Sequence, residues 1–309
     1  MSPTQASQPA AILALLASAV IWGVIWYPYR VLREAGIGGE LATLLTYLVA
    51  LVATLPMLLR EERPLARPGL LVAIALAGAA ANLGYVLALL DGRVMVVLLL
   101  FYLAPAWTVL LAWWLLGERA RPGGAGIIAV AMLGAAIMLW KPESAALSLG
   151  WPEWLGLGAG VAFALCNVLL RRGRDLPLSL RTVALFAGVC LLAAVAWIWR
   201  RTEVPMPLAL SAGTWGMIAL LGLILMLANL VLQYGLAHVA ANRAIVILLA
   251  ELPVAALAAY LLAGESMRWA DGVGGCLIVL AGLGAARQTE VPSPVPSAAP
   301  RRRGGKAAW

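Results

Sequence analysis

The sequence predicts an all-α integral membrane protein with ten transmembrane helices, arranged as two inverted five-helix repeats around a central cavity. Three observations lead to this prediction. Apolar windows long enough to cross a bilayer recur along the whole chain, the composition leaves no room for a soluble domain, and a 37-residue segment of the first half reappears in the second half.

The composition indicates that the chain lies in a lipid bilayer. Of the 309 residues, 63% are hydrophobic and only 12% are charged, and the mean hydropathy is +0.95. Soluble domains contain about 45–50% apolar and about 25% charged residues. Apolar windows of about 20 residues cross roughly 30 Å of hydrocarbon, and in lipid each must satisfy its own backbone hydrogen bonds as a helix. The ten predicted spans are residues 11–30, 39–59, 69–90, 94–116, 122–140, 153–171, 179–199, 212–236, 242–263 and 269–286.

Membrane topology, rather than a nucleic acid partner, explains the net charge of +8. Lys and Arg collect in the cytoplasmic loops of membrane proteins. With residues 1–10 as a cytoplasmic N-terminus, 15 of the 22 Lys and Arg residues fall in the inner loops and the C-terminal tail. We therefore expect both termini in the cytoplasm of a bacterial-type cell, with the spans in its inner membrane. Residues 287–309 are rich in Pro, Ser, Ala and Arg, which predicts a disordered basic tail able to touch anionic lipid.

The cysteines are few and isolated. Cys166, Cys190 and Cys276 stand singly inside predicted spans, without the spacing of a metal or redox motif. We expect them to act as small apolar side chains, and we expect neither a metal nor a cofactor.

The two halves of the chain repeat one another. Residues 82–118 align with residues 229–265, so that Asn82 falls on Asn229 and the Gly-Glu pair at 117–118 falls on that at 264–265. The predicted repeats are residues 11–140 and 150–286. Since each contains five spans, an odd number, the second repeat enters the bilayer from the opposite side. Inverted repeats are typical of secondary transporters, which bind their substrate near the midplane between the repeats.

Three segments carry a family resemblance: "LAELPVAALAAYLLAGE" in the ninth span, "WGVIWYPYR" in the first and "CNVLLRR" in the sixth. The halves resemble the EamA domains of the drug/metabolite transporter superfamily. The chain length and the aromatic first and fourth spans are most similar to the aromatic amino acid exporters of the YddG type. This resemblance implies a basket of ten helices whose cavity is lined mainly by the first, third and fourth helices of each half.

Glu251 is the only one of the fourteen acidic residues that is predicted deep inside a span. A charged carboxylate at the centre of a membrane helix costs about 2.5–3.5 kcal/mol on insertion scales. The position two before Pro105 in the first half is Leu103, so the fold itself does not require an acid there. We predict that Glu251 faces the cavity, where it attracts a substrate ammonium or takes up a proton. The alternative is a protonated carboxyl that donates a hydrogen bond to a neighbouring helix carbonyl.

Aromatic and amide side chains within the spans complete the predicted site. Nine of the thirteen tryptophans lie near span ends, as in an interfacial belt. Trp22 and Trp26 lie inside the first span, one turn apart, where an indole N–H needs a partner. The alternatives are packing alone for the tryptophans and interhelical hydrogen bonds for the amides. The predicted substrate-binding residues are Trp22, Trp26, Asn82, Tyr85, Tyr102, Phe163, Asn167, Asn229, Gln233 and Glu251.

Proline and glycine residues predict the shape of the helices. Pro105 and Pro253 are expected to kink the fourth and ninth spans, with a role in gating or in shaping the basket. The GxxxG pair Gly156 and Gly160, and the glycines of the fifth and tenth spans, predict close helix packing or a homodimer contact.

These features favour an amino acid exporter that works by alternating access on neutral, apolar or aromatic cargo. No Lys or Arg lies deep in a span, which argues against phosphorylated cargo, because such cargo needs a cationic clamp. Efflux of hydrophobic or cationic drugs is the alternative, since an aromatic cage with one carboxylate also suits a cation. A membrane-embedded enzyme is a remote alternative, because the chain has one His and no carboxylate pair within the spans.

Overall fold

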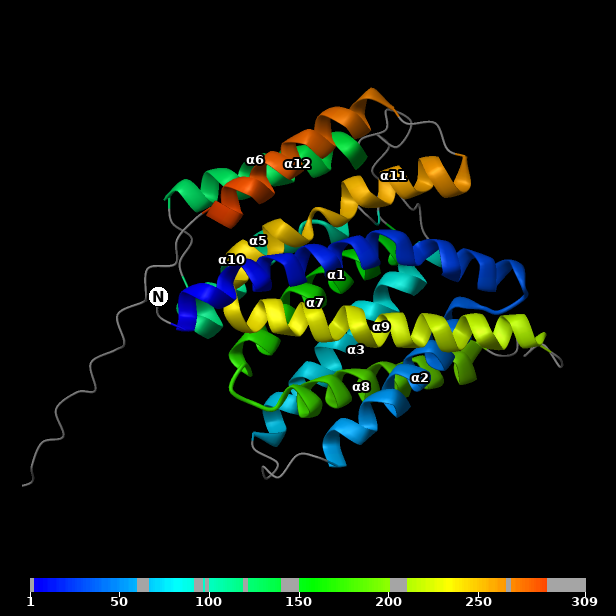
Figure 1. Cartoon of the computed structure of the whole chain (residues 1–309). Coiled ribbons are helices and arrows are strands. Elements are labelled where there is room, and N and C mark those ends of the chain that lie inside the picture. Colours follow the sequence, from blue (N-terminus) through cyan, green and yellow to red (C-terminus); the bar gives the residue numbers. More distant parts are fainter. Residues whose placement is uncertain are drawn as a thin grey trace, which may run out of the picture.

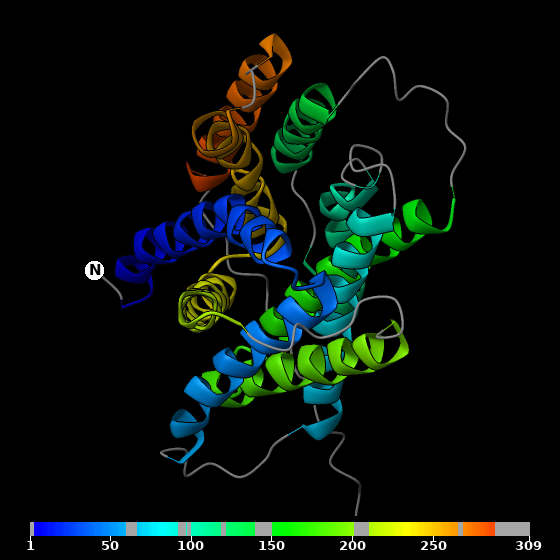
Figure 2. The same cartoon turned by 90° about the vertical axis from the view of Figure 1, so that its right-hand side faces the viewer.

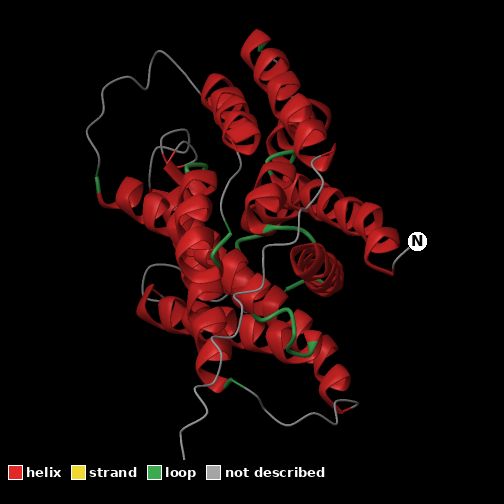
Figure 3. Ribbon diagram, turned by 90° about the vertical axis from the view of Figure 1, so that its left-hand side faces the viewer, coloured by secondary structure: helices red, strands yellow, loops and turns green. Residues whose placement is uncertain are grey.

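The computed structural model describes residues 3–59, 67–91, 97, 100–118, 122–139, 150–200, 210–264 and 268–287. All regular secondary structure in this part of the chain is helical (Figure 3). Residues 288–309, nearly all of the predicted basic tail, lie outside the described residues. The helices are α1 (Pro3–Glu34), α2 (Gly39–Leu59), α3 (Pro68–Asp91), α5 (Ala104–Leu116), α6 (Pro122–Leu139), α7 (Trp151–Arg172), α8 (Leu178–Arg200), α9 (Ala212–His238), α10 (Ala241–Leu248), α11 (Glu251–Ala263) and α12 (Trp269–Arg287) (Figure 1).

Each of the ten predicted spans has a helical counterpart in the described part of the chain. Seven segments are long and apolar enough to cross a membrane, and three further apolar helices are shorter. Large apolar side chains on the outside are exposed, for example Leu76 at 66% and Leu191 at 69%. In a bilayer these side chains contact lipid. The predicted all-helical membrane fold is confirmed.

Seven of the nine tryptophans predicted near span ends lie on the outside of the protein. Their side chains are exposed, as the interfacial belt predicted from the sequence requires. The residues concerned are Trp113, Trp114, Trp151, Trp154, Trp199, Trp215 and Trp269. Trp197 instead packs against the buried core, and Trp140 lies outside the described residues.

The two halves interlock, and their contacts repeat when the halves are exchanged. The packing of α1 on α9 corresponds to that of α7 on α3, and the packing of α2 on α9 corresponds to that of α8 on α3. In the same way, α1 packs on α11 as α7 packs on α5. Two pairs map onto themselves: α2 with α8, and α6 with α12, which lie side by side at the top of Figures 1 and 2. The two repeats therefore form one packed unit.

Glycine allows the closest approaches between the halves. A Cβ atom added to Gly188 of α8 would collide with the carbonyl oxygen of Ala75 in α3. A Cβ atom added to Gly222 of α9 would lie 2.6 Å from the carbonyl oxygen of Thr46 in α2. Because neither backbone can yield without moving a whole helix, these glycines set the distance between the helices.

The GxxxG pair and some glycines of the fifth and tenth spans also pack within the chain. A Cβ atom at Gly160 of α7 would lie 2.6 Å from the carbonyl oxygen of Phe101, and Gly156 faces the same segment one turn away. A Cβ atom at Gly134 of α6 would lie 2.6 Å from the carbonyl oxygen of Gly274 in α12. These three glycines therefore act in helix packing inside one molecule. Gly126, Gly272 and Gly282 have open space where a Cβ atom would lie, and the homodimer contact stays a prediction.

The fourth and ninth predicted spans are not the continuous helices that the sequence predicted. The ninth is interrupted by a turn at residues 249–250, between α10 and α11. In the fourth, Phe101 is helical, a turn follows at residues 102–103, and α5 begins at Ala104. Discontinuous membrane helices in equivalent positions of two repeats are typical of transporter binding sites, because the interrupted backbone lines a cavity.

The two interruptions occupy the same place in the repeat. Both ends of α5, at residues 104 and 116, precede the ends of α11, at residues 251 and 263, by 147 residues. In this register Glu251 corresponds to Ala104 and not to Leu103, because the prolines of the two segments are one position out of step. Since Ala104 is apolar as well, the fold still does not require an acid at this position.

Pro105 and Pro253 stand immediately after the two interruptions. Pro105 is the second residue of α5, and Pro253 is the third residue of α11. A proline in the first turn of a helix costs no hydrogen bond, since the backbone N–H groups there have no partner within the helix. The prolines therefore stand in the first turn of a new helix segment, and at both predicted kinks a short turn separates two segments.

Candidate functional site

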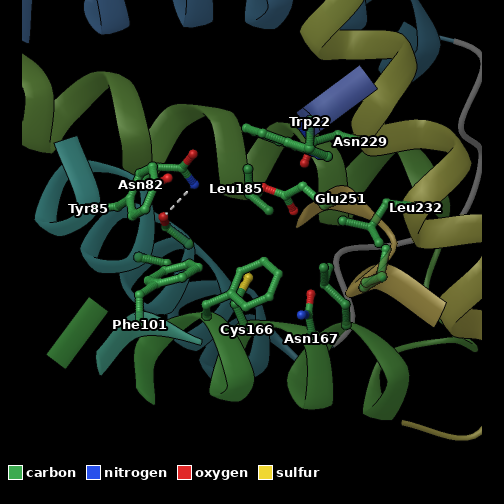
Figure 4. Close-up of a pocket in the computed structure, with 15 residues that line it drawn as sticks. Trp22, Asn82, Tyr85, Phe101, Cys166, Asn167, Leu185, Asn229, Leu232 and Glu251 are labelled. Carbon is green, nitrogen blue, oxygen red and sulfur yellow. Dashed lines mark hydrogen bonds between the residues drawn. The ribbon is translucent and has the colours of Figure 1, made fainter. Parts of the chain in front are cut away.

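A pocket lies where the two helix breaks meet the long helices of both halves (Figure 4). Its cavity volume is about 90 Å³. Pockets for small molecules typically measure about 300–1,000 Å³, so the pocket would have to widen around a cargo of that size. The lining residues are Trp22, Gly78, Ala81, Asn82, Tyr85, Phe101, Phe163, Cys166, Asn167, Leu170, Leu185, Asn229, Leu232, Leu248 and Glu251.

The lining residues come from the helices that the sequence analysis expected. In the first half they belong to α1, α3 and the segment before α5; in the second half they belong to α7, α9, α10 and α11. These are the first, third and fourth helices of each half. Among the lining residues that the structure describes, Leu185 of α8 is the one from another helix.

Glu251 brings a carboxylate to the pocket from the break in the ninth span. It is the first residue of α11, at the helix end where the helix dipole favours a negative charge. The hydroxyl of Tyr102 donates a hydrogen bond to Glu251 Oε1 over 3.0 Å. Because Tyr102 lies in the break before α5, this bond joins the two interruptions. The carboxylate thus accepts a hydrogen bond from a phenol, which differs from the donation to a helix carbonyl considered from the sequence.

Close packing of α1 supports this arrangement. A Cβ atom at Gly23 would lie 2.9 Å from the backbone oxygen of Glu251 and 2.8 Å from a side-chain carbon of Val254. The absence of a side chain at Gly23 lets α1 rest on the start of α11. The neighbouring Trp22 then reaches the pocket beside Glu251 (Figure 4).

Aromatic rings form one wall of the pocket. The ring of Phe101 lies 4.7 Å from that of Tyr85 and 5.4 Å from that of Phe163, measured between ring centroids. The sequence analysis named Tyr85 and Phe163 but missed Phe101. The repeat held a signal for it, because the separation of 147 residues pairs Phe101 with Leu248, and both line the pocket immediately before a helix break.

Two asparagines at equivalent positions of the repeats line the pocket with amides that are already bonded. Asn82 Oδ1 accepts a hydrogen bond of 2.7 Å from the hydroxyl of Tyr47, and Asn82 Nδ2 donates one of 2.8 Å to the carbonyl of Gly78, drawn as a dashed line in Figure 4. Asn229 Nδ2 donates a hydrogen bond of 3.0 Å to the carbonyl of Leu225. For Asn82, the bond to Tyr47 is the interhelical bond that the sequence analysis considered as its alternative role.

Asn167 is different, because its amide donor is unused. The side chain lines the pocket from α7 and points into the space that Glu251 also faces (Figure 4). Asn167 is only 3% exposed, and its Nδ2 atom has no hydrogen-bond partner among the residues that the structure describes. A buried donor without a partner costs about 1–3 kcal/mol. A ligand with an acceptor oxygen in the pocket would satisfy it.

Three predicted binding residues do not line this pocket. Tyr102 affects the pocket only indirectly, through its hydrogen bond to the lining residue Glu251. Trp26 packs edge-on against Tyr27, with ring centroids 5.7 Å apart. Gln233 is fully buried, and its Nε2 atom donates a hydrogen bond of 2.9 Å to Thr182 Oγ1, which ties α9 to α8.

The charges of the pocket limit the solutes that it can hold. Among the described residues that line it, Glu251 is the one acid, and none is Lys or Arg. A carboxylate without a fixed counter-ion attracts ammonium groups, whereas phosphate groups need cationic donors. The aromatic wall offers flat apolar surface for the remainder of the solute.

The comparisons with known proteins agree with this architecture. The model of the EamA-like transporter family matches the chain twice, over residues 9–140 and 150–286. A solved crystal structure has the same fold, with a TM-score of 0.73 and 18% sequence identity over 89% of this chain and 97% of that chain. No curated protein matches the sequence. Since the family matches span most of its length, the chain is a multi-pass membrane transporter that belongs to the EamA-like transporter family.

Proposed function

We propose that the protein exports neutral amino acids, aromatic and apolar ones, across a bacterial inner membrane, and that the pocket described above is the binding site. In this proposal the two halves expose the pocket alternately to each side of the membrane. The proposed binding residues are the pocket-lining Trp22, Asn82, Tyr85, Phe163, Asn167, Asn229 and Glu251, with Phe101 added, and Tyr102 holds Glu251 in position.

The observation that carries this proposal is the pairing of a carboxylate with an unused amide donor. An amino acid has an ammonium group and a carboxylate on the same carbon. In the pocket, the ammonium group would bind Glu251, and the carboxylate would accept the hydrogen bond that Asn167 Nδ2 lacks. Each of the two polar groups of the cargo would then meet a complementary group of the protein.

The aromatic wall supports the preference among amino acids. Phe101, Phe163 and Tyr85 would pack against the side chain of the cargo, and Trp22 would cover it beside Glu251. Aromatic pairs add about 0.5–1.5 kcal/mol beyond the burial of apolar area. The resemblance to aromatic amino acid exporters of the YddG type, noted in the sequence, favours the same cargo.

Efflux of hydrophobic monocations is the second candidate. It is supported by the same carboxylate and aromatic rings, which together attract a quaternary ammonium group. Such a cation has no acceptor for Asn167 Nδ2, and this is the physical ground on which we favour amino acids.

Transport by purified protein in liposomes tests the proposal. A panel of labelled amino acids, offered with and without an imposed pH difference, should show protein-dependent flux of tryptophan, phenylalanine and leucine, and little flux of arginine or glutamate. A quaternary ammonium dye should compete weakly. Strong competition by the dye, without amino acid flux, would instead support the second candidate.

The proposed orientation places both termini in the cytoplasm. A membrane-impermeant thiol reagent tests it on single-cysteine variants: Arg174→Cys, at the exposed end of α7, should react from the cytoplasmic side in cells and vesicles. A cysteine at Gly36, in the turn between α1 and α2, should react from the outside.

A further inference from the structure

An ion pair joins the two halves at one end of the helix bundle. Arg171 Nε at the end of α7 lies 2.9 Å from Glu118 Oε1, just after α5. The side chains are 8% and 20% exposed. The ion pairs of Arg30 with Glu34 and of Arg67 with Asp175 differ from it, because their side chains are about half exposed or more.

Each charge of this ion pair lies at a helix end that carries the opposite partial charge. Arg171 Nη1 donates hydrogen bonds of 3.2 Å to the carbonyls of Leu236 and Ala237, in the last turn of α9. The backbone N–H of Ala241, the first residue of α10, donates a hydrogen bond of 2.9 Å to Glu118 Oε2. Cations are favoured at the C-terminus of a helix and anions at its N-terminus. One ion pair thus ties together the ends of α5, α7 and α9 and the start of α10.

The local structure aims Glu118 at these partners. Gly117 ends α5 with a positive φ of 70°, a conformation that favours glycine, and the N–H of Glu118 donates to the carbonyl of Ala112 over 3.1 Å. The chain therefore turns back across the end of α5. Beside it lies an apolar layer of buried side chains from three helices: Ala112, Val168 and Ala241, with Leu111, Leu115 and Leu116 packed against them.

The ion pair and the apolar layer are close to the pocket along α7. Asn167 lines the pocket, Val168 belongs to the apolar layer, and Arg171 lies four residues after Asn167, one turn further on the same helix face. A path from the pocket toward this end of α7 would therefore meet the apolar layer and the ion pair.

We propose that the Glu118–Arg171 ion pair is the gate residue pair at this end of the transporter, which is the cytoplasmic end in the orientation proposed above. While the pair is closed, it holds α5, α7 and the α9–α10 junction together over the apolar layer. When it separates, these helix ends move apart and the pocket opens to this side, so that cargo can enter. The inference rests on the assignment of the pocket as the transport site, but not on the identity of the cargo.

The equivalent arginine of the other half supports this role. Trp22 and Phe163 both line the pocket, and they lie 141 residues apart, as do Arg30 and Arg171. Arg30, however, is 49% exposed, and it pairs with Glu34 of its own helix over 3.2 Å. The equivalent arginines therefore differ in exposure and in ion-pair partner, as expected of a transporter that is closed at the Arg171 end. Arg30 also provides a matched control.

Thiol labelling of the pocket tests the proposal without any substrate. Cys166 lines the pocket, so a variant with Cys190→Ala and Cys276→Ala carries one reporter thiol. A small membrane-impermeant thiosulfonate reagent is added to the side of the membrane on which Arg174→Cys reacts. Labelling after denaturation gives the total thiol. The variants are Glu118→Gln and Arg171→Gln, with Arg30→Gln as the control.

We expect Glu118→Gln and Arg171→Gln to raise the labelling rate of Cys166 from the Arg174 side by at least about tenfold, which corresponds to about 1.4 kcal/mol in the balance between closed and open states. Arg30→Gln should leave that rate unchanged. Should Arg171→Gln fail to fold, Glu118→Gln still decides the matter, because glutamine keeps an acceptor for the N–H of Ala241. Labelling at the parental rate in folded Glu118→Gln protein, or an increase only from the opposite side, would overturn the gate. Absence of amino acid flux would overturn only the proposed cargo.

Discussion

The hydroxyl of Tyr102 donates a hydrogen bond of 3.0 Å to Oε1 of Glu251, across a sequence separation of 149 residues. Each residue belongs to a break in a membrane helix, and the two breaks are equivalent in the two repeats. The bond therefore connects the two interrupted helices at the edge of the pocket. A cargo ammonium bound to Glu251 would act on both breaks at once, and this contact is the natural place for binding to influence the movement of the halves.

Removal of the Tyr102 hydroxyl should weaken cargo binding by changing the position of Glu251. A hydrogen bond to a charged group contributes about 1.5–3 kcal/mol, so Tyr102→Phe is expected to raise the half-saturating amino acid concentration about tenfold or more while protein yield stays normal. Tyr260→Phe is the control, because Tyr260 is 52% exposed on α11. In a Glu251→Gln background the effect of Tyr102→Phe should largely disappear, and full additivity of the two changes would contradict the positioning role.

Neutralisation of Glu251 should abolish most transport while the protein still folds. Glutamine retains an oxygen that accepts the bond from Tyr102, but it no longer attracts an ammonium group. We expect Glu251→Gln to reduce amino acid flux in liposomes about 10- to 100-fold, in line with the loss of a charge-assisted hydrogen bond. Glu34→Gln, on the exposed end of α1, is the control. Flux and pH dependence equal to those of the parent protein would end the assignment of Glu251 to the site.

Replacement of Asn167 should lower the affinity for cargo without lowering the stability of the protein. Asn167→Leu keeps the size of the side chain and removes a buried donor that has no partner, so the thermal unfolding temperature should stay the same or rise. Affinity for amino acids should fall about tenfold, because their carboxylate loses its donor. Asn82→Leu is the matched comparison: it breaks the bonds to Tyr47 and Gly78 and should lower the unfolding temperature. A clear loss of stability in Asn167→Leu would show that its amide has a structural partner.

The two tryptophans of the first span should differ in their effect on transport. Trp22 lines the pocket, whereas Trp26 packs against Tyr27. Trp22→Ala is therefore expected to raise the half-saturating concentration for aromatic amino acids about three- to tenfold, and Trp26→Ala to change it less, since an aromatic contact contributes about 0.5–1.5 kcal/mol. Concentration series with tryptophan and with leucine measure this. Equal effects of the two changes would indicate that Trp26 also meets the cargo during the cycle.

The contact between α3 and α8 should not tolerate a methyl group at Gly188. Its added Cβ would collide with the backbone carbonyl of Ala75, so Gly188→Ala is expected to destabilise the protein by about 1–3 kcal/mol. A Cβ atom added to Gly158 on α7 would lie in open space, so Gly158→Ala should have almost no effect. Thermal unfolding of the two variants in the same detergent compares them directly. Equal unfolding temperatures would show that α3 and α8 are less tightly packed than described.

The membrane fold follows from the sequence alone because its causes are local. The cost of unpaired backbone groups in lipid makes each apolar window a helix, whatever its neighbours are. The repeated segment with Asn82 and Asn229 reveals the two halves, since similar segments fold alike. Glu251 stands out in the same way, because a carboxylate in an apolar run is costly wherever the helix packs.

Tertiary structure decided what depends on residues far apart in the chain. The partner of Glu251 is 149 residues away, and the partner of Arg171 is 53 residues away. No periodicity of the sequence gives the distance or angle between such helices. Hydropathy also could not locate the breaks before α5 and α11, because the residues on both sides are equally apolar. Asn167 and Gln233 are both buried amides in membrane helices, so the sequence treats them alike. Only the packing of the helices shows that Asn167 lines the pocket while Gln233 bonds to a neighbouring helix.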